Sequence, residues 1–291
     1  MSTPPPTFTT LISAEELMAL QAASAPLMVF DCSFDLMQPT AADTLFAQAH
    51  IPGAVQAHLD RNLSAKDPTD AANGGRHPLP GREVLAAWLA SVGFDNTLQA
   101  VVYDRNGANY CGRLWWMLKW AGHEAVAVLD GGLQAWQQAG GTVETGAATV
   151  RPAARFALSD EKARLATTAE VAASLGRATQ TLLDARATPR FRGEMEPLDP
   201  VAGHIPGALN RPFGQNIGAD GKFKPADVLK AEFNALLAGQ DPAGVVHHCG
   251  SGVSAVPNLL AMEVAGLGRA ALYAGSWSEW CNTPGLPCAQ G

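Results

Sequence analysis

The sequence holds one cysteine in a setting that suits covalent chemistry. Residues 249–254 read CGSGVS; they follow the apolar run and two histidines of residues 245–248 and precede a helical pattern. Gly250 and Gly252 allow a tight turn with positive φ between a predicted strand and a predicted helix. Inward-facing backbone N–H groups and the positive end of the helix favour a thiolate over a thiol. Cys249 is therefore a candidate nucleophile, and a buried, unreactive cysteine beside a tight turn is the alternative.

The remaining cysteines offer weaker signals. The chain has five cysteines, an odd number, and no two of them form a C-x-x-C pair. That pattern predicts neither a zinc site nor a disulfide framework, and we expect no metal. Cys281 and Cys288 lie seven residues apart near the C-terminus. They are either free thiols or a redox pair that regulates activity.

Composition narrows the class of protein. The 291 residues are 47% hydrophobic and 16% charged, with a formal net charge of -7. These values are typical of a globular chain of about two domains, and an acidic chain is not expected to bind nucleic acid through bulk charge. The sequence shows no secretory signal pattern and no run of about 18 apolar residues, so we expect a soluble cytoplasmic protein without a membrane partner.

The chain contains an internal repeat. HIPGA occurs at residues 50–54 and again at residues 204–208, an offset of 154. Two S/T-x-x-E capping boxes, beginning at Ser13 and Thr167, keep the same offset and predict helix starts. Motifs that recur in the same order indicate a duplication.

Two further matches extend the repeat to the cysteine. DGGLQAW at residues 130–136 corresponds to AGSWSEW at residues 274–280, and VVYD corresponds to VHHC. The second match places Asp104 in the first half where Cys249 stands in the second. Only the second half therefore has a nucleophile at this strand end.

Each half alternates short β-branched runs with helical patterns. This order predicts the α/β class, with a parallel sheet flanked by helices in each of two domains. We expect a first domain over residues 8–140, a Gly/Ala/Thr-rich linker over 141–165 and a second domain over 166–288. Ligands of open parallel sheets bind at the carboxyl ends of the strands, which is where Cys249 falls.

The first half carries about nine extra residues within the polar segment 58–80. This Gly/Pro-rich segment contains Asp60, Arg61, Arg76 and His77. It is either a plain surface loop or a loop that is long because it completes a site.

The cysteine loop, the paired HIPGA motifs, DGGLQAW and GSWSEW together resemble the two-domain sulfurtransferases of the rhodanese superfamily, and most closely the 3-mercaptopyruvate branch. The resemblance covers about residues 10–285. It implies two tandem rhodanese-like domains, of which the first lacks the catalytic cysteine. The sequence itself shows no Gly-rich phosphate loop and no dinucleotide fingerprint, so we expect no organic cofactor.

The resemblance also implies a reaction. Cys249 takes the outer sulfur of a small-molecule donor as a persulfide, and a thiol, cyanide or thioredoxin accepts that sulfur. The loop residues Gly250, Gly252, Val253 and Ser254 bind the substrate.

Three further residues match the proton-handling group of the mercaptopyruvate branch. Ser251 is the serine two residues after the cysteine, and Asp60 and His77 match the aspartate and the histidine that act with it.

Two features of the sequence indicate which sulfur donor the protein uses. The family holds the donor carboxylate with two arginines; Arg190 matches the first, whereas the second has no counterpart, and Arg192 is only a near neighbour in the sequence. Arg186 is expected to form an ion pair with Asp184 instead. The thiosulfate branch has basic residues where this loop has Gly250 and Ser251, and this difference favours 3-mercaptopyruvate over thiosulfate.

Three alternatives stay open. A thiosulfate:cyanide sulfurtransferase would use the same cysteine with another donor. A phosphatase is disfavoured because Ala255 stands where an arginine would clamp the phosphoryl group. A non-catalytic interaction module is disfavoured because Cys249 and Ser251 are both retained.

Overall fold

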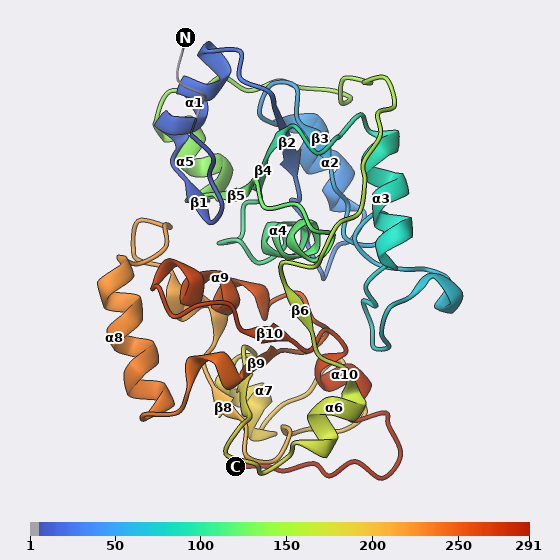
Figure 1. Ribbon diagram of the computed structural model, residues 1–291, viewed down its shortest axis with the longest axis vertical. Coiled ribbons are helices and arrows are strands. Elements are labelled where there is room, and N and C mark those ends of the chain that lie inside the picture. The colour runs from blue at the N-terminus through green and yellow to red at the C-terminus, as the bar shows by residue number, and fades with distance from the viewer. Residues whose placement is uncertain (1–5) are drawn as a thin grey trace. The chain divides into compact units, whose positions relative to one another are not determined.

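The computed structural model describes residues 6–291, which divide into two compact units (Figure 1). Unit 1 contains residues up to 63, residues 80–162 and residues 220–222. Unit 2 contains residues 64–79, 163–219 and 223–291. Most of the insertion in the first half of the sequence is therefore packed with the second half of the chain.

Unit 1 is built on a five-stranded parallel sheet with the strand order β1-β5-β4-β2-β3. Its strands are β1 (Leu11–Ile12), β2 (Leu27–Asp31), β3 (Val55–Gln56), β4 (Gln99–Tyr103) and β5 (Val126–Leu129). Its helices are α1 (Ala14–Ala22), α2 (Ala41–Gln48), α3 (Arg82–Ser91), α4 (Cys111–Trp120) and α5 (Gly132–Gln138).

Helices cover both faces of this sheet because successive residues of a strand point to opposite sides. On β2, Val29 joins the core that contains Trp136 of α5. The next residue, Phe30, packs against Trp88 of α3, with the ring centroids 6.0 Å apart. The apolar runs of the sequence are thus explained by burial on two faces.

Unit 2 repeats the arrangement, with a parallel sheet in the order β6-β10-β9-β7-β8. Its strands are β6 (Arg164–Leu165), β7 (Thr181–Asp184), β8 (Leu209–Asn210), β9 (Val245–His248) and β10 (Ala271–Leu272). Its α-helices are α6 (Thr168–Ala173), α7 (Thr188–Arg192), α8 (Ala226–Leu237), α9 (Val256–Val264) and α10 (Ser276–Trp280). Three 3-10 helices, η1 (Pro68–Asp70), η2 (Phe213–Asn216) and η3 (Pro242–Gly244), complete it.

The two histidines of β9 point to opposite faces of the unit 2 sheet. Nε2 of His247 lies 3.1 Å from the sulfur of Met262 on α9. His248 faces Tyr273, and its Nδ1 lies 3.9 Å from Asp184 Oδ2. In Figure 1, α8 and α9 lie on one side of β9 and β10, and α6 lies on the other.

The repeated motifs hold the fold in the same way in both units. His50 stacks on Phe46, with its Nδ1 2.8 Å from the carbonyl oxygen of that residue. His204 does the same with Phe191, also at 2.8 Å. The HIPGA histidines therefore have a structural role. Both predicted capping boxes are present, at the starts of α1 and α6.

Among the described residues, no helix has the length and apolar character needed to cross a membrane.

Candidate active site

The turn after β4 shows what this kind of loop can hold. The carboxylate of Asp104 accepts hydrogen bonds from four backbone N–H groups, at distances of 2.8 to 3.1 Å. The donors are Asn106, Ala108, Tyr110 and Cys111, all between the end of the strand and the start of α4. The loop of unit 1 is thus a backbone cradle filled by its own anion.

The loop that carries Cys249 is the counterpart in unit 2. Cys249 follows the last residue of β9, and α9 begins seven residues later, the same spacing as from Asp104 to α4. Cys249 is 2% exposed, and its own N–H donates to the hydroxyl of Ser276 at 3.1 Å. The sequence-based match of Asp104 with Cys249 is therefore reproduced in the fold.

The two glycines of this loop serve different purposes. Gly252 has a φ of +73°, and a Cβ there would lie 2.2 Å from the carbonyl oxygen of Ala274. Gly250 does not have a positive φ, so only Gly252 uses the conformational freedom expected of the two glycines. A Cβ at Gly250 would instead crowd guanidinium nitrogens of Arg76 and Arg190.

The insertion is anchored beside this loop. The backbone N–H of Arg76 donates to the hydroxyl of Ser278 on α10 at 3.1 Å. A Cβ on Gly75, whose φ is +91°, would lie 2.7 Å from both that hydroxyl and the carbonyl oxygen of Gly275. Only glycine allows the backbone to approach this closely, so the glycines of the insertion let this segment pack against the rest of unit 2.

This anchoring brings His77 to the cysteine loop. Its Nδ1 lies 2.9 Å from the hydroxyl oxygen of Ser251, two residues after Cys249. A histidine and a serine at this distance can exchange a proton, with Nδ1 accepting from the hydroxyl when the ring carries its hydrogen on Nε2. Two of the three residues assigned to proton handling are therefore in contact.

Arg190 on α7 lies beside the same loop, with its Nη1 3.4 Å from the position of a Cβ at Gly250. Its Nε and Nη2 donate to the carboxylate of Glu196 at 3.2 and 2.6 Å. Burial alone would raise the pKa of Glu196, but the hydrogen bonds from Arg190 and from backbone N–H groups hold that pKa below its usual range. The Glu196 carboxylate is therefore charged at neutral pH and fixes the guanidinium.

Residues 13–139 and 167–283 each match the family model of the Rhodanese-like domain. The chain belongs to the rhodanese family. Each of its two rhodanese-like domains has a five-stranded parallel sheet flanked by helices.

Full-length relatives are named as sulfurtransferases. A Pseudomonas aeruginosa protein named "Probable 3-mercaptopyruvate sulfurtransferase" is 44% identical over 97% of this chain and 98% of its own length. A Mycobacterium tuberculosis protein that carries a provisional name as a thiosulfate sulfurtransferase is 42% identical over 97% of each chain. The Escherichia coli 3-mercaptopyruvate sulfurtransferase structure superposes with a TM-score of 0.78 at 30% identity, covering 94% of this chain and all of its own.

In this rhodanese chain, Arg76 of the insertion also lies beside the cysteine loop, a position that the sequence did not predict for it. One of its terminal nitrogens bonds to a carboxylate oxygen of Asp199, and its other terminal nitrogen would lie 3.0 Å from a Cβ at Gly250. The sequence showed a basic residue next to His77, but nothing local indicates a partner 123 residues away. Arg192, the nearest substitute along the chain, is 57% exposed and pairs with Glu194.

Arg186 forms the ion pair expected from the sequence. Its Nη2 lies 2.6 Å from Asp184 Oδ2, and both side chains are buried. The same guanidinium donates to the carbonyl oxygen of Gly203 at 2.7 Å and lies over the ring of Trp277. Through these contacts, Arg186 stabilises the end of β7.

The other predicted site residues have clear places. Val253 is buried and Ser254 half-buried in the cysteine loop, and the Val253 carbonyl accepts a hydrogen bond from Val256 at the start of α9. Asp60 follows β3 in unit 1, where it is half-buried and its N–H donates to Nδ1 of His58. The part of Asp60 in the reaction stays a prediction.

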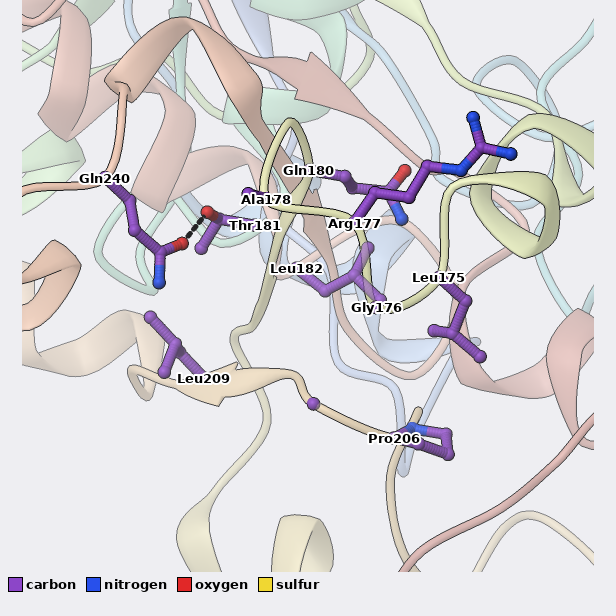
Figure 2. Close-up of a pocket in the computed structure, with 11 residues that line it drawn as sticks. Leu175, Gly176, Arg177, Ala178, Gln180, Thr181, Leu182, Pro206, Leu209 and Gln240 are labelled. Carbon is purple, nitrogen blue, oxygen red and sulfur yellow. Dashed lines mark hydrogen bonds between the residues drawn. The ribbon is translucent and has the colours of Figure 1, made fainter.

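The pocket in Figure 2 lies at the other end of the unit 2 sheet. It has a volume of about 350 Å³ and is lined by residues that include Thr181, Leu209 and Gln240. Thr181 begins β7 and pairs with Val245, the first residue of β9. Cys249 follows the opposite end of β9, so this pocket is not the one that serves the cysteine.

Over residues 6–291, no group of three or more His, Cys, Asp or Glu side chains is arranged to hold a metal ion.

Proposed function

We propose that this protein moves a sulfane sulfur from 3-mercaptopyruvate to a thiol or cyanide acceptor through a persulfide on Cys249. The observation that carries the proposal is the 2.9 Å contact between His77 Nδ1 and Ser251 Oγ. This contact supplies a proton-transfer pair two residues from the nucleophile. The full-length relatives are named as sulfurtransferases, which supports the same class of reaction.

In the first half-reaction, the Cys249 thiolate attacks the thiol sulfur of the donor. A sulfur–sulfur bond forms and the carbon–sulfur bond breaks, so the electron pair leaves as the enolate of pyruvate. Ser251 gives the enolate a proton, and His77 Nδ1, protonated by the hydrogen that the donor thiol releases, returns one to Ser251, so that the persulfide is left as an anion. Arg190 holds the donor carboxylate, and pyruvate departs.

In the second half-reaction, the acceptor attacks the outer sulfur of the persulfide. The sulfur–sulfur bond breaks and its electron pair returns to Cys249 as a thiolate. Backbone N–H groups of the loop stabilise the persulfide anion and the thiolate of Cys249, as their counterparts stabilise Asp104 in unit 1. Thiols, cyanide and reduced thioredoxin are the proposed acceptors.

Further assignments belong to the same proposal. Asp60 acts with Ser251 and His77 in proton handling, and the loop residues Gly250, Gly252, Val253 and Ser254 bind the substrate. The domains span residues 8–140 and 166–288, joined by 141–165, and the protein acts in the cytoplasm without a nucleic acid or a membrane as its partner.

Thiosulfate is the second candidate donor. Two guanidinium groups reach the Gly250 position, which suits an anionic donor of either kind, and one relative carries a thiosulfate name. The loop positions themselves, Gly250 and Ser251, are neutral, which favours the monoanion.

Single-turnover mass analysis tests the proposal. Reduced protein is mixed with either donor, without acceptor, and the Cys249 peptide is checked for one added sulfur atom. Faster labelling by 3-mercaptopyruvate than by thiosulfate is the expected result. Labelling by thiosulfate alone would keep the persulfide and replace the donor; a lack of label from both would contradict the proposed reaction.

A further inference from the structure

The feature that goes beyond these assignments is the convergence of two arginines on one backbone position. A Cβ at Gly250 would lie 3.0 Å from Nη2 of Arg76 and 3.4 Å from Nη1 of Arg190. Gly250 is the residue next to Cys249. Both guanidinium groups therefore border the space beside the nucleophile.

A buried carboxylate holds the two arginines together. The side chain of Asp199 is 2% exposed; its Oδ1 bonds to Arg76 Nη1, and its Oδ2 lies 3.4 Å from Arg190 Nη2. A planar guanidinium fixed on one edge presents its remaining N–H groups in a set direction. Asp199 is thus placed to orient both forks.

The two arginines stay within reach of a ligand. The side chain of Arg76 is 27% exposed and that of Arg190 is 18% exposed. Their carboxylate partners, Asp199 and Glu196, are almost fully buried. Two partly exposed guanidinium groups supported by buried carboxylates are an arrangement that can clamp an anionic group.

We infer that Arg76 and Arg190 form a two-arginine clamp for the carboxylate of the donor, with Asp199 as its positioning residue. Arg76 comes from the insertion, so the second guanidinium is supplied from the first half of the sequence. This inference rests on the proposed function.

The local charge balance sharpens the ligand class. Three arginines and three carboxylates form one connected set of ion pairs, and their charges cancel: Arg76, Arg186, Arg190, Asp184, Glu196 and Asp199. A site of this kind gains little from a second negative charge on its ligand. The clamp therefore suits a planar monoanionic carboxylate, such as that of a 2-keto acid, better than a tetrahedral dianion.

The test compares an anionic with a neutral thiol reagent at Cys249. Iodoacetate and iodoacetamide both alkylate a thiolate with release of iodide, and only iodoacetate carries a carboxylate. The ratio of their rates, measured on the Cys249 peptide, reports the attraction of the clamp without any sulfur transfer. Arg76→Gln should lower this ratio and raise KM for 3-mercaptopyruvate, each about 10-fold, the effect of losing a charge-assisted hydrogen-bonding partner. The exposed Arg192→Gln is the matched control and should leave both unchanged.

Two outcomes would overturn the inference: a folded Arg76→Gln protein with the wild-type ratio and KM, or an equal loss of rate with both reagents. If Arg76→Gln shows no cooperative thermal transition, Arg76→Lys replaces it, since lysine keeps the charge but lacks the second N–H edge. A smaller fall in the ratio, about 3-fold, is then expected, and a wild-type ratio would overturn the clamp. Failure of the wild type to take sulfur from 3-mercaptopyruvate would sink the proposed function alone, because the alkylation ratio still decides the clamp.

Discussion

Asp104 and Cys249 occupy the same place in two copies of one turn. Each follows the central strand of its own five-stranded sheet, and in each case a helix begins seven residues later. The third residue after each is a glycine with a positive φ, Gly107 at +66° and Gly252 at +73°. Since the first turn surrounds a carboxylate with N–H groups, we expect the second to hold an anion too.

The shared turn predicts that a carboxylate can replace the sulfur. Cys249→Asp should fold, and its free energy of unfolding at pH 7 should exceed that of Cys249→Asn by about 1 kcal/mol or more, because charge-assisted hydrogen bonds are the stronger ones. Urea unfolding measures the difference. Neither variant should form a persulfide.

The Asp and Asn side chains have nearly the same size, so the comparison isolates the charge. An Asn variant as stable as the Asp variant, or more stable, would show that the loop of unit 2 does not favour an anion. The same pair of residues at position 104, wild type against Asp104→Asn, gives the reference value for the loop of unit 1.

The contact between His77 and Ser251 predicts coupled losses of activity. Ser251→Ala and His77→Ala should each lower kcat for 3-mercaptopyruvate by about 100-fold, the usual contribution of positioned proton transfer. The double variant should lose little more than either single one, because the two residues act as a unit.

A surface residue of the same insertion provides the control for that series. Lys66→Ala should retain wild-type kcat, since Lys66 is exposed. Losses for Ser251 and His77 that simply multiply would contradict the pairing. Asp60→Asn belongs in the same series, because a fall in kcat matching that of His77→Ala is expected if Asp60 acts in the same proton transfer.

The local parts of this architecture could be predicted from the sequence. The duplicated α/β units, the capping boxes at Ser13 and Thr167, and the turn at Cys249 follow from short patterns whose physics lies within a few residues. The Arg186–Asp184 ion pair was also predictable, since the two residues are only two positions apart at a strand end.

The second guanidinium of the site could not be predicted in this way. Arg76 reaches Asp199 because Gly75 lets the insertion approach the backbone of Gly275, and no local pattern in the sequence reports that approach. The need for a glycine at position 250 could not be predicted either, because it depends on the space taken by arginines from two distant segments. Contacts between distant segments decide the site, whereas short-range patterns decide the fold.

Buried His247 predicts a loss of stability in acid. Burial, and then the neighbouring His248, lower its pKa to about 3. The unfolded chain takes up a proton near pH 6.5, so this stability is fully present above that pH and is lost as the pH falls toward 3. Between pH 7.5 and 5.0 the wild type should lose about 2 kcal/mol of unfolding free energy through this residue.

His247→Leu removes the titrating ring while keeping an apolar contact for Met262. Its unfolding free energy, measured in urea at both pH values, should fall less than that of the wild type by about the same 2 kcal/mol. Parallel losses in the two proteins would show that His247 does not titrate on unfolding.

Cys281 and Cys288 are free thiols, and their surroundings predict unequal reactivity. Burial, and then the negative charge of Asp199, raise the pKa of Cys281 to about 11. Cys288, by contrast, is exposed at the surface. At pH 8 only about 1 in 1,000 Cys281 side chains is then a thiolate, so iodoacetamide should label Cys288 first. The Cys281 rate should rise about tenfold per pH unit up to pH 10.

The Cys288→Ser variant tests the redox-pair hypothesis in protein isolated without reductant. An unchanged rate of Cys281 labelling would mean that the two thiols are independent. Labelling of Cys281 only after Cys288 is removed would establish a disulfide between them.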